Sequence, residues 1–121
     1  MYTGYFGKIK TYKKAGLIPV SICGKAPDWY TGHQYKKLAP KLGFFVEWSV
    51  GEHKGDNDYY IEHFKEEVLD TLRPEDVINE LKQFGQLQDI ILLCYEKPES
   101  FCHRHLVANW LNENGLYVTE F

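Results

Sequence analysis

The chain has 121 residues, of which 44% are hydrophobic and 16% aromatic, so a disordered or fibrous protein is excluded and one domain over residues 1–121 is predicted. A net charge of −3 gives no overall field that would attract nucleic acid or an anionic membrane. The longest apolar run, at 90–95, is too short to cross a bilayer, and no signal-peptide pattern is seen at the N-terminus, so we expect a cytoplasmic protein.

The first part of the chain predicts two strands separated by a basic segment. Residues 1–6 alternate apolar and small side chains and suit a short strand. Residues 7–15 carry four lysines and predict a loop or a short helix. Residues 17–23 predict the second strand, in which Pro19 lacks an N–H group and therefore favours the start of a strand or an edge of the sheet.

The next segment is rich in loop signals. Residues 24–32 combine glycine, proline and polar side chains directly after the second predicted strand. One helical turn is predicted at 35–38, before Pro40. Residues 44–48, Phe-Phe-Val-Glu-Trp, predict a third strand, and an exposed loop is expected at 51–57.

The second half predicts helices alternating with strands. Apolar side chains at three- and four-residue steps predict a helix whose buried stripe is formed by Ile61, Phe64, Val68 and Leu72. Pro74 begins a second helix, which Gly85 ends. Residues 89–95 are nearly all apolar, as is typical of a central strand covered on both faces. A last helix, stopped by Gly115, and an alternating strand at 116–121 complete the pattern.

This order of elements predicts the fold class. A β…αβαβ sequence implies parallel pairing with right-handed crossovers. We therefore predict a single three-layer α/β domain with a mostly parallel sheet of about five strands and helices on both faces. Three cysteines are an odd number in a domain large enough not to need cross-links, so free thiols are expected.

The candidate site lies where the strand at 89–95 ends and the last helix begins. In α/β proteins, sites commonly form at the carboxyl ends of strands and at helix N-termini. Cys102 is expected at the helix N-terminus beside His103 and Arg104, an environment that lowers a thiol pKa and favours a nucleophile. Glu96 follows the strand end, where it could orient these groups or act as a general base.

Arg104 offers a second interpretation of the same junction. A guanidinium beside the free N–H groups of a first helical turn can hold phosphate, sulfate or carboxylate. This anion-binding role is the one we favour, and it is compatible with a reactive Cys102. The structural alternative is that Cys102 packs beneath the loop while Arg104 pairs with Glu96 or Glu99.

A metal site is the third interpretation. Cys94 and Cys102 could bind zinc together with His103 and His105. Structural zinc sites usually contain close ligand pairs such as C-x-x-C, and that spacing is absent here. The spacing therefore favours no metal, and no cofactor is predicted.

Two aromatic residues in the loop at 24–32, Trp29 and Tyr30, could supply a stacking surface for a planar ligand such as a base. Core packing is the alternative for at least one of them. Several lysines precede this loop and could add a local basic patch, namely Lys8, Lys10, Lys13 and Lys14. These residues leave a nucleic-acid or protein binding module open as an alternative function.

The stretch from Leu92 to Leu111 resembles the C-terminal signature of the domain of unknown function 488 (DUF488) family: a strand ending in L-C-x-E, a short loop, and C-H-R opening a helix. The N-terminal part is similar to a short subgroup of that family through residues 2–6, 27–30 and 35–40. By this resemblance, the motif positions are Cys94, Glu96, Cys102, His103 and Arg104. The family comprises small cytosolic α/β proteins of bacteria, archaea and phages. Its longer members begin with a T-I-G-H-S-like turn, whose histidine and serine are missing from residues 3–7 here.

The leading functional hypothesis is a small enzyme acting on a phosphate-bearing or nucleotide-like ligand. In this hypothesis Arg104 holds the anion, Cys102 and His103 carry out the chemistry, and Glu96 orients them. The remaining residues expected at the ligand are Cys94, Trp29 and Tyr30. A non-enzymatic nucleic-acid or protein binding module and a Cys/His metal site are the alternatives, and the sequence does not predict the oligomeric state.

Overall fold

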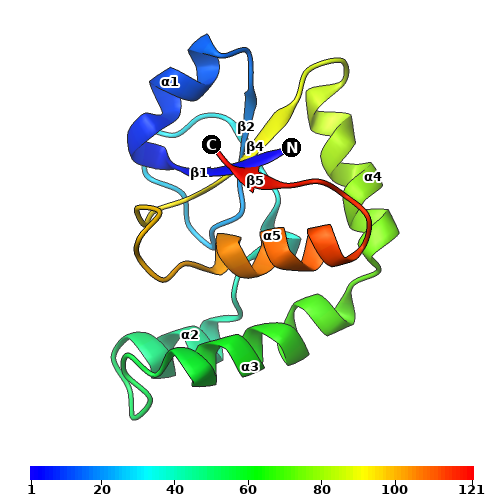
Figure 1. The fold of residues 1–121 in the computed structure, drawn as a ribbon. Helices are drawn as coiled ribbons and strands as arrows, with labels where there is room; N and C mark the ends of the chain where they lie inside the picture. Colours follow the sequence, from blue (N-terminus) through cyan, green and yellow to red (C-terminus); the bar gives the residue numbers. More distant parts are fainter.

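Five parallel strands form the centre of the computed structural model, which describes all 121 residues (Figure 1). Their order across the sheet is β3-β2-β4-β1-β5, and every neighbouring pair is parallel. The strands are β1 (Tyr2–Tyr5), β2 (Ile18–Ser21), β3 (His33–Gln34), β4 (Ile90–Cys94) and β5 (Thr119–Glu120). The predicted α/β fold with a parallel sheet is confirmed.

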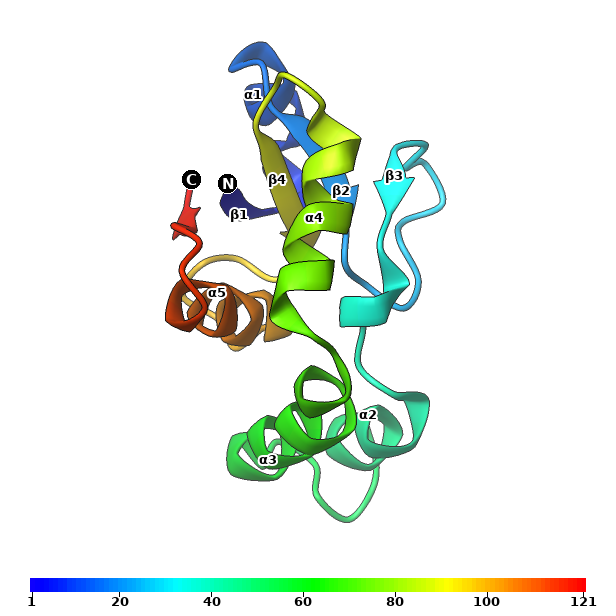
Figure 2. The same cartoon turned by 90° about the vertical axis from the view of Figure 1, so that its right-hand side faces the viewer.

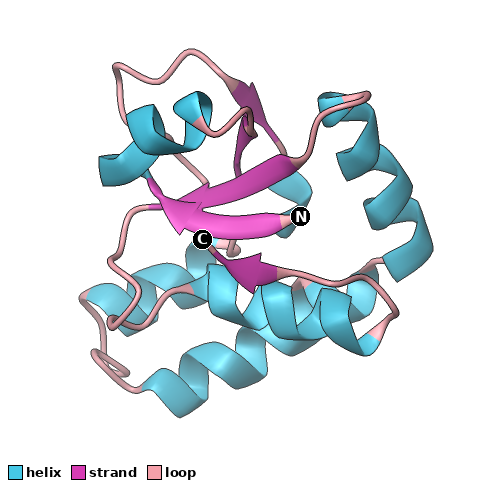
Figure 3. Ribbon diagram, turned by 45° about the horizontal axis from the view of Figure 1, so that its top comes forward, coloured by secondary structure: helices cyan, strands magenta, loops and turns pink.

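Three helices cover the two faces of the sheet, namely α1 (Ile9–Lys14), α4 (Pro74–Gly85) and α5 (His103–Glu113). The β1-α1-β2 connection runs along the sheet in the opposite direction to the connections through α4 and α5. Right-handed crossovers therefore place α1 on one face and α4 and α5 on the other (Figure 3). None of the helices has the length and apolar character needed to cross a membrane.

The remaining two helices, α2 (Leu42–Ser49) and α3 (Asn57–Glu67), pack against each other beyond one end of the sheet (Figure 2). This is the end at which the parallel strands finish, because the chain passes from β3 directly towards α2. At the start of α3, the Asp56 carboxylate accepts a hydrogen bond of 3.1 Å from the Tyr59 N–H group. The α2–α3 helix pair therefore faces the edge of the sheet where sites form in α/β proteins.

The strand predicted at 44–48 is wrong, because these residues lie in α2. The prediction followed the intrinsic β preference of aromatic and β-branched side chains, which packing overrides here. Phe44 and Trp48, one helical turn apart, both pack against Tyr60 of α3, with ring centroids 5.2 and 5.0 Å from the Tyr60 ring. The sequence pattern also missed β3, which has two exposed residues and no alternation to reveal it.

The buried stripe predicted for α3 is confirmed at Phe64 and Val68 and wrong at Ile61. Ile61 is 40% exposed, whereas Tyr60 and Phe64 are buried and point towards the rest of the protein. The helix ends at Glu67 and does not reach Leu72, because a short 3₁₀ turn follows at 69–71. Because Tyr60 lies on the buried face of α3, it points towards the carboxyl end of the sheet.

Pro19 lies in an internal strand, between β3 and β4, instead of at a sheet edge. The short β3 pairs only with Val20 and Ser21, so no strand faces Pro19 on that side. Its carbonyl oxygen accepts a hydrogen bond of 3.2 Å from the Tyr30 hydroxyl group. Proline is tolerated because its missing donor is not needed at this position.

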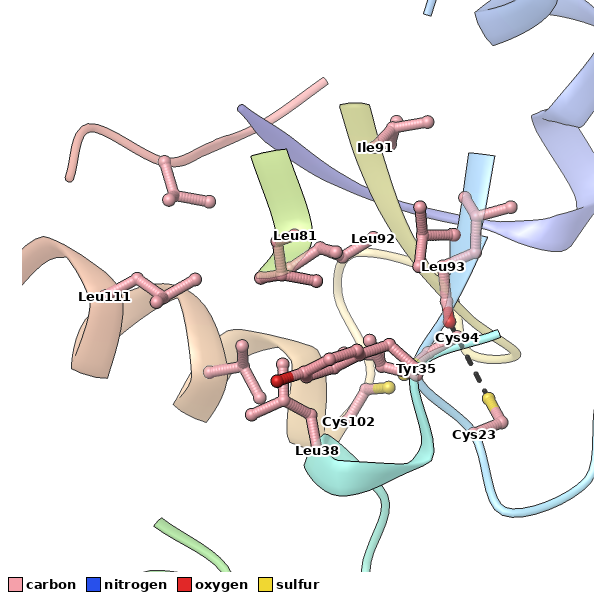
Figure 4. Close-up of a cluster of buried hydrophobic side chains, with 14 of the residues drawn as sticks. Cys23, Tyr35, Leu38, Leu81, Ile91, Leu92, Leu93, Cys94, Cys102 and Leu111 are labelled. Atoms are coloured by element: carbon pink, nitrogen blue, oxygen red, sulfur yellow. Dashed lines mark hydrogen bonds between the residues drawn. The ribbon is translucent and has the colours of Figure 1, made fainter. Parts of the chain in front are cut away.

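The core is built around β4, whose five residues, 90–94, are all buried, as predicted for the central strand. Figure 4 shows Leu81 of α4 and Leu111 of α5 on the same side of the strand as Leu92. The three leucines are almost fully buried. Burial of a leucine side chain stabilises the fold by about 1.5–3 kcal/mol, so this layer fixes the position of the strand end at Cys94.

Candidate functional site

A cavity of about 550 Å³ lies between the carboxyl ends of β2 and β4 and the α2–α3 pair. Its floor is formed by side chains that follow these strands or begin α5, namely Cys23, Cys94, Cys102 and His103. Its wall is apolar and largely aromatic, formed mainly by Leu42, Phe45, Trp48, Tyr60 and Phe101. Two exposed charged residues, Lys25 and Glu96, stand at its mouth.

Cys102 is the residue immediately before α5, as the sequence predicted. Its backbone is extended, and its carbonyl oxygen accepts a hydrogen bond of 3.1 Å from the His105 N–H group. The backbone N–H of Arg104 contributes to lowering the pKa of the Cys102 thiol. The sulfur therefore sits at the positive end of the helix dipole, which stabilises a thiolate.

The thiol of Cys94 is the main partner of Cys102. A hydrogen bond from Cys94 lowers the pKa of Cys102, burial acts in the opposite direction, and His103 lowers it further. Burial raises the pKa of Cys94 well above its ordinary value, and the neighbouring Cys102 adds to this shift. Cys102 therefore carries the negative charge, and Cys94 remains the protonated donor.

His103 is buried beneath the two sulfurs. Its Nε2–H donates a hydrogen bond of 2.7 Å to the Ile22 carbonyl oxygen, which leaves Nδ1 facing the Cys94 sulfur at 3.4 Å. Burial lowers the pKa of His103, but interaction with the Cys102 sulfur outweighs this effect, so the net pKa is raised. An imidazolium next to a thiolate is the arrangement that activates cysteine nucleophiles.

Cys23 joins this cluster, although sequence reasoning did not place it in the site. Its thiol donates a hydrogen bond of 3.7 Å to the Leu93 carbonyl oxygen (Figure 4). Cys23 follows β2 just as Cys94 ends β4, and neighbouring parallel strands bring their carboxyl ends together. This correspondence was the signal in the sequence that could have identified Cys23.

Arg104 does not have the predicted anion-binding position. Its side chain is 0% exposed and does not line the cavity. Nε and Nη2 donate to the Glu120 carboxylate at 3.1 and 2.9 Å, and Nη1 donates to the Glu96 carbonyl oxygen at 2.6 Å. A structural ion pair was the alternative, but its carboxylate comes from β5 and not from Glu96 or Glu99. The physical reason is burial, which requires a counter-charge for the guanidinium.

Glu96 lies at the mouth of the cavity, with an exposed side chain. Its carboxylate makes no hydrogen bond within the protein, so it does not orient Arg104 or His103 as predicted. The contact between Arg104 and Glu96 uses the backbone carbonyl oxygen instead. This contact fixes the loop after β4 and leaves the carboxylate free to meet a ligand.

Trp29 and Tyr30 do not line the cavity, which corrects their predicted ligand-binding role. Tyr30 is buried, and its hydroxyl donates to the carbonyl oxygens of Pro19 and His33, so its function is structural. Trp29 is 58% exposed and packs against Phe6, with ring centroids 6.0 Å apart. The aromatic surface at the site comes from other residues.

That aromatic surface is formed by α2, α3 and the loop before α5. Trp48 and Tyr60 both contact Phe101, and their ring centroids lie 5.6 and 5.0 Å from the Phe101 centroid. Sequence reasoning missed Trp48 because residues 44–48 read as a strand. It missed Tyr60 because Ile61 was assigned to the buried stripe. The spacing of Tyr60 from Phe64, one helical turn, was the available signal.

A soft metal ion could be held by Cys94, Cys102 and His103, whose ligand atoms all lie within 4.8 Å of one another. The spacing in the sequence favours no metal site, but the fold brings the three ligand atoms close together. His105 is not part of the group, and its buried Nε2 makes no hydrogen bond. Thiolate and imidazole ligands are the set that zinc prefers.

Comparison with protein families identifies the family of this chain. A family model described as "Active DUF488-N3 subclade" matches residues 11–115. No curated protein and no solved structure matches the chain. All the residues that line the cavity, from Cys23 to His103, lie within the matched span.

Proposed function

We propose that this chain, which belongs to the DUF488 family through a subclade described as active, is a small enzyme that uses Cys102 as its nucleophile. The match confirms the family resemblance seen in the C-x-E and C-H-R motifs. The observation that carries the proposal is a sulfur at a helix N-terminus, beside His103, opening onto a cavity of about 550 Å³. Three free cysteines also support a cytoplasmic location, where thiols stay reduced.

The cavity supports a nucleotide-like ligand as the substrate class. Ligand pockets commonly measure about 300–1,000 Å³ and combine apolar walls with a few polar groups. Trp48 and Phe101 offer stacking surface for a planar ring. Lys25 at the mouth supplies the positive charge for a phosphate group, in place of the buried Arg104. The residue proposed to bind the phosphate group therefore lies in the loop after β2 and not at the start of α5.

The proposed reaction is nucleophilic substitution through a covalent intermediate. The Cys102 thiolate forms a bond to an electrophilic carbon of the ligand, and the leaving group departs with its bonding electron pair. The His103 imidazolium gives the leaving group its proton. Water then donates a proton to His103, bonds to the same carbon and releases Cys102 as the thiolate.

Alkylation by iodoacetamide at pH 6 tests the nucleophile. At this pH, less than about one per cent of a free thiol with a pKa near 8.5 is ionised. An ionised Cys102 should react about tenfold faster than glutathione, after allowing for the lower nucleophilicity of a low-pKa thiolate. Mass spectrometry identifies the modified residue, and Cys23→Ser is the control variant that keeps Cys102. A Cys102 that reacts no faster than glutathione overturns the proposal.

A metal site is the second candidate, favoured by the convergence of Cys94, Cys102 and His103 within 4.8 Å. In this case Cys102 would act as a ligand, and ligand binding would occur at an open coordination position facing the cavity. Elemental analysis of purified protein decides the matter. One equivalent of zinc, lost in Cys94→Ser, supports the metal site, and the absence of stoichiometric zinc, iron or copper excludes it.

A further inference from the structure

We propose, building on the thiol enzyme inferred above, that Tyr60 is a further catalytic residue whose hydroxyl donates a hydrogen bond to a carbonyl oxygen of the ligand. The substrate class is thereby narrowed to planar ligands whose reacting carbon is a carbonyl carbon or is conjugated to one. The Tyr60 hydroxyl would take the place of an oxyanion hole above the Cys102 sulfur.

The hydroxyl of Tyr60 stands out among the buried tyrosines. Tyr60 is 2% exposed, yet its hydroxyl makes no hydrogen bond with any group of the protein. The other buried tyrosines all have partners: the Tyr12 hydroxyl accepts from the Tyr5 N–H at 3.2 Å, and Tyr35 donates to Glu80 at 2.9 Å. The hydroxyl is not enclosed by protein atoms and is therefore reached from the cavity that Tyr60 lines, where it is free to donate a hydrogen bond to a ligand.

The position of the Tyr60 ring is fixed. Phe44, Trp48 and Phe101 each contact it at a steep angle, with ring centroids 5.2, 5.0 and 5.0 Å away. Tyr60 lines the same cavity as Cys102. A donor that is already held in place requires no reorganisation when charge develops on the ligand.

The surroundings of Tyr60 also keep its proton in place. Burial raises the pKa of the phenol, and the neighbouring Cys102 thiolate raises it further. The phenol therefore keeps its proton and can act as a hydrogen-bond donor. It cannot serve as a base beside a thiolate.

The electron movement explains why such a donor is needed. When the Cys102 thiolate bonds to the reacting carbon, a π electron pair moves onto the carbonyl oxygen. Tyr60 stabilises that oxygen without giving up its proton. As the leaving group departs with its bonding pair, the electrons on oxygen return and the carbonyl group is restored.

Two reagents that differ in the carbonyl group test the role of Tyr60. N-ethylmaleimide adds to a thiolate with charge developing on a conjugated carbonyl oxygen, whereas iodomethane contains no oxygen. In Tyr60→Phe, the rate of Cys102 modification by N-ethylmaleimide should fall by about tenfold or more, as for loss of an oxyanion donor. The iodomethane rate should stay within about twofold, because the thiolate itself is unchanged.

The test is decided by the ratio of the N-ethylmaleimide rate to the iodomethane rate for Cys102. Tyr35→Phe is the matched control, since this buried hydroxyl lies outside the cavity, and its ratio should equal that of the wild type. A Tyr60→Phe ratio equal to the wild-type ratio overturns the role of Tyr60, whether both rates fall together or neither changes. Slow reaction of wild-type Cys102 with both reagents overturns the nucleophile instead, so the two failures are distinguishable.

Discussion

Replacing Glu120 by glutamine should destabilise the fold, because it leaves the buried guanidinium of Arg104 without a counter-charge. The Arg104 side chain is 0% exposed and that of Glu120 is 25% exposed, with 2.9 Å between Nη2 and Oε2. The same carboxylate accepts a hydrogen bond of 2.6 Å from the Thr3 hydroxyl. The pair therefore joins β5, β1 and the start of α5.

The geometry sets the size of the effect. Removing one partner of a fully buried ion pair costs about 3–5 kcal/mol, because the remaining charge stays in a medium that cannot solvate it. Water reaches part of Glu120, which places the expected loss near the lower limit, at about 3 kcal/mol. Glutamine keeps one acceptor oxygen, so the loss reflects the missing charge more than a missing hydrogen bond.

Urea unfolding followed by far-ultraviolet circular dichroism measures the free energy of unfolding of Glu120→Gln at pH 7. Asp70→Asn is the matched control, because Asp70 pairs with Lys65 at 3.0 Å but both side chains are more than half exposed. That variant should stay within about 0.5 kcal/mol of the wild type, as is usual for a surface pair. A Glu120→Gln protein equally close to the wild type would refute the account of Arg104.

Two other predictions concern acid stability and strand packing. Burial raises the pKa of Glu120, but the hydrogen bonds from Arg104 outweigh this and leave it below the unfolded value of about 4.3. The stability that the ionised Glu120 contributes is complete above the unfolded pKa and is lost as pH falls through the folded pKa. The difference in unfolding free energy between wild type and Glu120→Gln should therefore narrow below about pH 4. A difference that stays constant with pH in urea titrations would contradict this. A Cβ on Gly4 would lie 2.5 Å from the Tyr12 hydroxyl oxygen, so Gly4→Ala should cost about 1–3 kcal/mol in thermal unfolding. Gly43→Ala, where a Cβ meets nothing, should stabilise α2 by up to about 1 kcal/mol, and equal effects at the two sites would disprove the packing argument.

The sequence predicts those parts of the fold in which local pattern and tertiary packing agree. Residues 90–94 form a buried central strand because no polar side chain interrupts them. Pro74 fixes the start of α4 through its backbone geometry alone. The segment 44–48 is different, since its side chains suit a strand or a helix, and only the contact with α3 selects the helix.

The candidate site is predictable where its residues are close in the sequence. Cys102 and His103 follow from the helix start, which is a local signal. The partner of Arg104 is Glu120, 16 residues away, and only the pairing of β5 with β1 brings the two together. Tyr60 belongs to a helix pair that no sequence pattern connects to the sheet edge. Convergence of distant segments is decided by packing, which one sequence does not display.

The cavity is assembled from two separate stretches of the chain. The sulfur cluster and His103 lie at the sheet edge and the start of α5, whereas most of the aromatic wall, including Tyr60, lies within the continuous segment 42–60. On the proposed function, ligand selectivity could therefore change through substitutions within that segment while the sulfur cluster stays intact. Exchange of the α2–α3 hairpin between family members offers a direct route to altered selectivity in this fold.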